Sequence, residues 1–178
     1  MEMTRRQLLL LSLSAVPVCA KGVLDWQREN LLIADRLDRS RATARLFVIK
    51  PQWVESEKQL NANPKLYFHR YPIRGQADLA DADTDRLLRA LSKALHRYSI
   101  NDGVSMCFDP RHALRLKSNG LVEAELLICF ECSQLYYFGK GKPLHGYLRG
   151  GGDVFDEVAG AYGLPRVNKP VIQAPYMR

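Results

Sequence analysis

The sequence has no apolar run long enough to cross a lipid bilayer, no internal repeat and no low-complexity linker. A transmembrane helix needs roughly 20 consecutive apolar residues. The most apolar segment begins at Leu8 and is interrupted by Lys21 before it reaches that length. These absences predict a mature chain without a transmembrane span and with an ordinary globular architecture.

Signatures of nucleotide and nucleic-acid binding are also missing. A glycine run at residues 150–152 precedes a predicted helix, an arrangement that can bind phosphate, but the Lys-Ser/Thr pair of the nucleotide-binding loop does not follow it. Basic residues number 26 and acidic ones 19, yet the two kinds are interleaved, and no stripe of Lys/Arg alternates with aromatic residues. We expect no nucleic-acid partner, and the net charge of +7 favours acidic partners in general.

An export signal is the clearest feature that is present. Residues 4–7, Thr-Arg-Arg-Gln, precede a short leucine-rich segment that ends in Val18-Cys19-Ala20. A positive start, a short apolar middle and small residues at the end are typical of bacterial secretory signals. The arginine pair is that of twin-arginine signals, although two arginines also suit the general export route. The sequence predicts residues 1–20 as an export signal and places the protein in the periplasm or elsewhere in the bacterial cell envelope.

Residues 21–178 are predicted to form a single α+β domain. Removing residues 1–20 from the 178 leaves 158, an ordinary size for one domain, and lowers the net charge from +7 to +6. Hydrophobic residues make up 47% of the chain, which predicts folding rather than disorder.

The predicted elements follow the order strand, strand, helix, strand, strand, helix. Strands are predicted at 42–49, 66–71, 106–116 and 122–138, and helices at 82–97 and 153–162, while residues 23–38 suit either a short helix or a strand. Asn119-Gly120 predicts a two-residue turn between the third and fourth strands. This order predicts an antiparallel sheet of about four to five strands with helices packed on one face.

Three of the four cysteines lie in the two strands that flank this turn. The first strand contains Cys107-Phe108-Asp109-Pro110-Arg111-His112, and the second contains Ile128-Cys129-Phe130-Glu131-Cys132. Here the chain resembles an uncharacterised group of small exported bacterial proteins that share a Cys-Phe-x-Pro-Arg-His strand followed by an Ile-Cys-Phe-x-Cys strand. The resemblance covers roughly residues 66–165. It implies the strand layout and the exported location, and no activity.

A zinc site is one interpretation of these residues, because Cys107, His112, Cys129 and Cys132 are four ligand types that suit tetrahedral zinc. In a regular hairpin with Ser118 opposite Leu121, however, the four side chains are divided between two faces. Only a bulge would bring them together. We therefore predict no cofactor and keep zinc as an alternative.

A disulfide is the second interpretation. In the same register Cys107 lies opposite Cys132. Opposed Cβ atoms are about 4.5–5.5 Å apart and a disulfide needs about 3.5–4.5 Å, so a small adjustment closes the bond. An exported protein meets oxidising conditions. The sequence predicts a Cys107–Cys132 disulfide, with Cys129 as the free thiol.

A catalytic pair is the third interpretation, with Cys129 as nucleophile, His112 as base on the same face and Arg111 nearby. The alternative is that both side chains are structural: Arg111 would form an ion pair with Asp109, and His112 would be a core residue. Nothing resembling an oxyanion hole is seen, and residues 136–138 are interpreted as packing. The sequence therefore favours a non-catalytic binding protein, an immunity or inhibitor-type partner of another protein, over a thiol-dependent enzyme.

Overall fold

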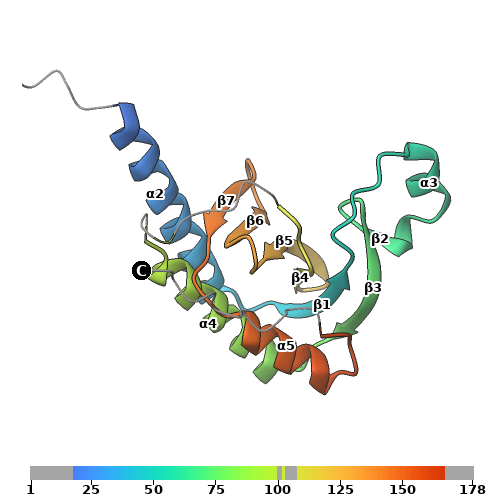
Figure 1. Ribbon diagram of the computed structural model, residues 1–178. Coiled ribbons are helices and arrows are strands. Elements are labelled where there is room, and N and C mark those ends of the chain that lie inside the picture. The colour runs from blue at the N-terminus through green and yellow to red at the C-terminus, as the bar shows by residue number, and fades with distance from the viewer. Residues whose placement is uncertain (1–17, 100–101, 103–107, 167–178) are drawn as a thin grey trace, which may run out of the picture.

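One seven-stranded antiparallel sheet, in the order β2-β3-β1-β4-β5-β6-β7, forms the centre of the molecule (Figure 1). The computed structural model describes residues 18–99, 102 and 108–166. Most of the predicted export signal, residues 1–17, lies outside them. The elements in chain order are α2 (Val18–Arg39), β1 (Thr43–Ile49), α3 (Glu57–Ala62), the 3-10 helix η1 (Pro64–Leu66), β2 (Tyr67–Phe68), β3 (Tyr71–Asp78), α4 (Asp81–Arg97), β4 (His112–Ser118), β5 (Leu121–Cys129), β6 (Gln134–Phe138), β7 (Leu144–Tyr147) and α5 (Gly152–Ala161).

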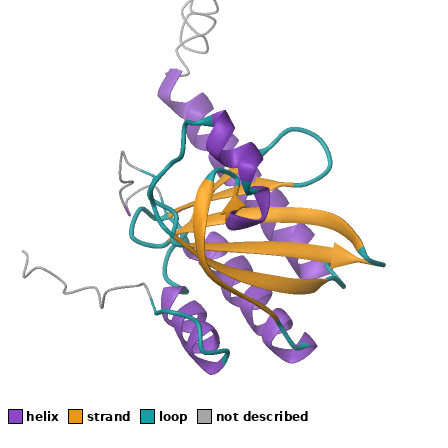
Figure 2. Ribbon diagram, turned by 90° about the vertical axis from the view of Figure 1, so that its right-hand side faces the viewer, coloured by secondary structure: helices purple, strands orange, loops and turns teal. Residues whose placement is uncertain are grey.

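The main core lies between one face of the curled sheet and helices α2, α4 and α5. Successive strand residues point to opposite faces, so alternate residues of the central strands enter this core, and fully burying one such side chain contributes about 1.5–3 kcal/mol. The largest buried side chains of this core are Ile33, Leu37, Leu46, Leu87, Leu91, Leu95, Leu114, Leu116 and Phe155. Helix α3 lies apart from α4 and α5 in both views (Figures 1 and 2).

The opposite face of the sheet carries a second, smaller core that we call the aromatic face. It consists of Phe47, Ile49, Phe68, Tyr71, Ala113 and Leu127, with Ile73, Phe108, Tyr136 and Phe138 packed against them. Rings stack along it: Tyr136 lies 4.5 Å from His145 and Phe138 lies 4.3 Å from His69, between ring centres. The sheet therefore buries side chains on both faces, although helices α2, α4 and α5 cover only one.

The predicted fold class, α+β with an antiparallel sheet, is confirmed, but the predicted four to five strands are wrong. The expected strand at 122–138 is two strands, β5 and β6, joined by a turn, and the expected strand at 66–71 contains β2 and the start of β3. Strand β7 was not predicted. The ambiguous segment 23–38 belongs to helix α2, and no helix in the described part of the chain is long and apolar enough to cross a membrane.

Helix α4 begins one residue before the predicted start and has no side-chain cap. Its N-cap is Ala80, whose backbone N–H donates instead to the Tyr162 hydroxyl at 2.8 Å. That hydroxyl donates in turn to Asp83 at 2.9 Å. Asp81 and Asp83 lie in the first turn, where negative charge complements the helix dipole. The C-terminal helix α5 is thereby connected to the start of α4.

The predicted turn between β4 and β5 is confirmed. Asn119 and Gly120 have φ of 51° and 78°, and Ser118 pairs with Leu121. The register then shifts between Leu116 and Lys117, because Leu116 pairs with Ala124 while Lys117 pairs with Val122. This bulge leaves one residue of β5 without an opposite partner and displaces every later pair by one position.

Helix α2 is attached to the sheet by one buried polar side chain. Asn30, 4% exposed, donates to the carbonyl oxygens of Leu95 at 3.0 Å and Tyr147 at 2.9 Å, and accepts from the Tyr147 N–H at 2.8 Å. Next to it Glu29 accepts from the His145 N–H at 3.0 Å. These contacts connect α2, the end of α4 and the edge strand β7.

Gly146 gives α2 the room to approach β7. A Cβ atom at this position would lie 2.9 Å from Ile33 Cδ1 and 2.9 Å from Leu95 Cδ2, closer than Cβ contacts in proteins allow. The glycine therefore leaves room for the Ile33 and Leu95 side chains to pack over β7.

Candidate functional site

The candidate catalytic residues Cys129 and His112 lie at one end of β4 and β5 but on different faces of the sheet. His112 pairs with Ile128, whereas the turn register without a bulge predicts Leu127 as its partner. The His112 side chain therefore faces α5, and Cys129 shares the aromatic face with Leu127. The expected placement of Cys129 and His112 on one face is wrong, because the bulge near Lys117 moves the register by one residue.

Cys129 and Cys132 form a disulfide across the turn between β5 and β6, with their Cα atoms 5.2 Å apart. The sequence prediction treated these residues as part of one strand, where residues three apart point to opposite faces. The turn at residues 130–133 removes that restriction. Cys132 is thus bonded to Cys129, whereas we predicted a bond from Cys132 to Cys107, a residue that lies outside the described ones. Cys129 is therefore not the free thiol that we expected.

The disulfide is enclosed by protein. Cys129 and Cys132 are 1% and 3% exposed. The Cys132 N–H donates to Cys129 Sγ at 3.1 Å, and the Asp109 N–H donates to Cys132 Sγ at 3.3 Å. A thiol pair that exchanges electrons with other proteins needs an accessible sulfur. This bond instead holds the β5–β6 turn against the chain that enters β4.

Arg111 and His112 have mainly structural contacts. Arg111 pairs with Glu131 at 3.1 Å, and not with Asp109 as we expected. His112 is fully buried, with ring centres of Phe130 and Phe155 at 5.7 and 5.5 Å. Neither of its ring nitrogens has a hydrogen-bond partner within the described chain, and the nearest carboxylate oxygen, of Asp156, lies 3.6 Å from Nε2. His112 is a core residue, as its structural interpretation predicts.

Of the four candidate zinc ligands, the three that the structure describes do not form a metal site. Among the described residues, no group of three or more His, Cys, Asp or Glu side chains is placed to hold a metal ion. Cys129 and Cys132 are bonded to each other, and His112 faces α5. The remaining ligand, Cys107, lies outside the residues that the structure describes.

The disulfide leads to a direct test. Replacing both Cys129 and Cys132 with alanine should lower the free energy of unfolding by about 2 kcal/mol, the loop-closure contribution expected for so short a loop. Urea unfolding of the oxidised protein measures this loss, and the same comparison under reducing conditions, where neither protein contains the bond, is the control. Peptide mapping without reductant should recover Cys129 linked to Cys132. Recovery of Cys107 linked to Cys132 would contradict this bond and support the pairing that we predicted from the sequence.

A charged cluster crosses the aromatic face at the β2–β3 turn. His69 and Arg70 have positive φ, 46° and 75°, which residues with a Cβ rarely adopt. His69 Nε2 lies 2.8 Å from Glu125 Oε2, and Arg115 Nε donates to Glu125 Oε1 at 2.6 Å. The hydrogen bond from His69, aided by Arg115, lowers the pKa of Glu125. These contacts connect the β2–β3 turn to β4 and β5.

This cluster predicts a loss of stability in acid. Because the folded pKa of Glu125 is below its unfolded value of about 4.3, its contribution is present above that pH and is lost as the pH falls through the folded pKa. Glu125→Gln should therefore flatten the fall of unfolding free energy below about pH 5. Urea titrations between neutral and acid pH measure the slope. Glu123→Gln, an exposed change on the same strand, is the control and should keep the wild-type slope.

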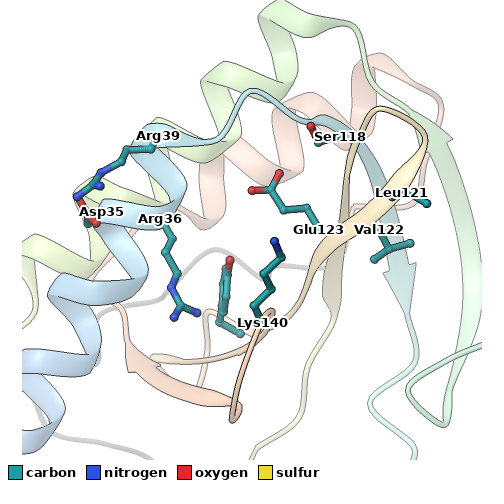
Figure 3. Close-up of a pocket in the computed structure, with 9 residues that line it drawn as sticks. Asp35, Arg36, Arg39, Ser118, Leu121, Val122, Glu123 and Lys140 are labelled. Carbon is teal, nitrogen blue, oxygen red and sulfur yellow. The ribbon is translucent and has the colours of Figure 1, made fainter.

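A pocket of about 610 Å³ lies where the end of α2 faces the β4–β5 hairpin (Figure 3). Helix α2, the hairpin, β6 and the chain after β6 each contribute to its wall. Its lining residues are Asp35, Arg36, Arg39, Ser118, Leu121, Val122, Glu123, Tyr137 and Lys140. Since ligand pockets usually measure about 300–1,000 Å³, this one is of suitable size for a small ligand or a chain end.

The pocket combines unpaired charge with exposed apolar side chains. Arg39 pairs with Asp35 on the rim. The Arg36 guanidinium lies over the Tyr137 ring, 5.3 Å from its centre. Within the described residues no ion pair involves Arg36, Glu123 or Lys140, although Arg36 also interacts with the Tyr137 side chain through a hydrogen bond. The charges of these three groups can therefore pair with a ligand.

Leu121 and Val122 form the hairpin side of the pocket and are 75% and 55% exposed. Sequence reasoning missed this site, although two apolar residues directly after an Asn-Gly turn are a usable signal. No such signal marks Arg36 or Lys140, because their place in the pocket depends on how α2 packs beside β7. The site therefore becomes visible only in the folded chain.

A scan against protein-family models finds no match to the chain, and searches of curated proteins and of solved structures find none either. Its function therefore has to be inferred from the chemistry of its own side chains.

Proposed function

We propose that this chain is an exported, non-catalytic binding protein of the bacterial envelope that acts on another protein, as an immunity or inhibitor-type partner does. The hairpin pocket carries the proposal. Leu121 and Val122 are strongly exposed beside Arg36 and Lys140. Exposed apolar side chains rimmed by charged ones are typical of surfaces that bind other proteins.

The arrangement of the cysteines supports binding over catalysis. A cysteine nucleophile must be a thiolate that a substrate can reach. Both described sulfurs are bonded to each other and buried, and His112 lies on the other side of the sheet. A thiol-dependent enzyme or zinc-binding protein built on these residues and Cys107 is therefore the less supported alternative.

The charge and the N-terminal segment support the rest of the proposal. After removal of residues 1–20 the predicted net charge is +6, which favours an acidic partner. The Arg-Arg pair and leucine run support export. A fusion of residues 1–25 to a reporter active only outside the cytoplasm tests this, and a reporter retained in the cell would refute the location. Unchanged export after Arg5→Lys with Arg6→Lys would assign the general route.

Cross-linking in living cells tests the binding function. A photo-crosslinking amino acid placed at Leu121 should give a light-dependent adduct with one protein, identified by mass spectrometry. The same amino acid at Arg89, an exposed position on α4, is the control and should give none. Leu121→Asp should then abolish co-purification of the identified partner. If the exported, folded protein forms no protein adduct at Leu121, the proposal is wrong.

A further inference from the structure

We infer that the pocket between α2 and the β4–β5 hairpin binds a carboxylate group that stands next to an aliphatic side chain, as at the C-terminus of a peptide. The inference names the ligand chemistry of the site on which the proposed function rests. It follows from three properties of the wall: its available cations, its exposed aliphatic surface and its single available carboxylate.

The cations provide the carboxylate site. Arg36 presents a planar set of N–H donors that matches both oxygens of a carboxylate. Its guanidinium is positioned over the Tyr137 ring, so less freedom is lost when a ligand binds. Lys140 reaches the same space from the chain after β6 (Figure 3). Arg39 is not required, because it is already paired with Asp35.

The hairpin provides the aliphatic site. Leu121 and Val122 line the pocket from the hairpin and are 75% and 55% exposed. Covering them removes apolar surface from water at about 25 cal/mol per Å². A ligand that places an aliphatic side chain beside its carboxylate can therefore contact Arg36 and Val122 together.

Glu123 restricts the ligand further. Its carboxylate faces the same pocket and has no ion-pair partner among the described residues. It repels a ligand that carries several negative charges, such as a phosphate ester, and it can accept a hydrogen bond from an amide or amine N–H. A peptide C-terminus has that N–H directly beside its carboxylate. The volume of about 610 Å³ admits a chain end but not a folded surface.

Fluorescence anisotropy with labelled peptides tests the inference. The probe is fluoresceinyl-Gly-Ser-Gly-Ser-Leu with a free C-terminus, and the comparison is the same peptide as a C-terminal amide. The exported protein should bind the acid at least about tenfold more tightly than the amide, the effect of losing one charge-assisted hydrogen bond. Arg36→Gln and, separately, Lys140→Gln should weaken binding of the acid, while Arg89→Gln should leave it unchanged. Circular dichroism checks that each variant is folded.

The source of the carboxylate is decided by a third ligand, N-acetyl-leucine, used as a competitor. Much weaker competition than by the unlabelled pentapeptide assigns the pocket to a peptide end, and equal competition assigns it to a free amino-acid derivative. Equal affinity for acid and amide, or no binding of either, overturns the inference. A Leu121 adduct in cells without peptide binding would leave the proposed function standing and remove only this ligand chemistry.

Discussion

Replacing Asn30 with leucine is expected to lower the free energy of unfolding by about 3 kcal/mol or more. The substitution removes the partner of the Leu95 carbonyl and of both backbone groups of Tyr147. Each buried backbone group left without a hydrogen bond costs about 1–3 kcal/mol. Urea unfolding followed by circular dichroism measures the loss.

Two further variants make this result specific to the hydrogen bonds. Leu31→Ala changes the neighbouring residue on the exposed side of α2 and should alter the free energy of unfolding by no more than about 0.5 kcal/mol. Asn30→Asp keeps the acceptor for Tyr147 N–H but turns a carboxylate oxygen toward two carbonyl oxygens, and it should also be strongly destabilising. A loss below about 1 kcal/mol for Asn30→Leu would show that water replaces these bonds.

Replacing Phe155 with alanine is expected to cost about 3–5 kcal/mol, the usual range for a buried phenylalanine. Helix α5 has only three fully buried side chains, those of Phe155, Val158 and Ala159. The Phe155 ring is the largest of them and packs 5.0 Å from the ring of Phe130. Its loss should release α5 from the sheet. Hydrogen exchange should then show faster exchange in α5 than in α4.

His112 offers the contrasting case beside the same ring. Because neither of its nitrogens has a hydrogen-bond partner in the described chain, His112→Leu removes buried polar atoms without breaking a bond. We expect it to be neutral or to stabilise the protein by about 1 kcal/mol. A large loss of stability, comparable to that of Phe155→Ala, would show that the His112 ring nitrogens make a stabilising polar contact, and would contradict this expectation.

The parts of the fold that were predictable are those set by local chemistry. The leucine spacing of residues 82–97 predicts α4 within one residue, and Asn119-Gly120 predicts the β4–β5 turn. The β5–β6 turn was missed because residues 130–133 contain neither glycine nor proline, and Ser133 takes the positive φ of 55° that glycine usually supplies. The disulfide depends on that turn, so its pairing was missed with it.

The candidate functional residues could not be placed from the sequence for a different reason. A one-residue bulge opposite Leu116 and Lys117 places Cys129 and His112 on different faces, and the sequence around it is typical of an uninterrupted strand. The pocket joins Arg36 to Lys140, which are far apart along the chain, and they meet only because α2 packs against β7. Periodicity within a segment contains no information about such long-range contacts.

The hydrogen bonds from α2 to the edge strand β7 affect how the protein behaves at high concentration. A bare edge strand can pair with another chain and start a fibril. In β7 the N–H groups of His145 and Tyr147 are occupied by Glu29 and Asn30. At the other edge β2 is only two residues long, and the neighbouring strand exposes Arg74 and other polar side chains. The chain thus protects both edges of its sheet against intermolecular strand addition.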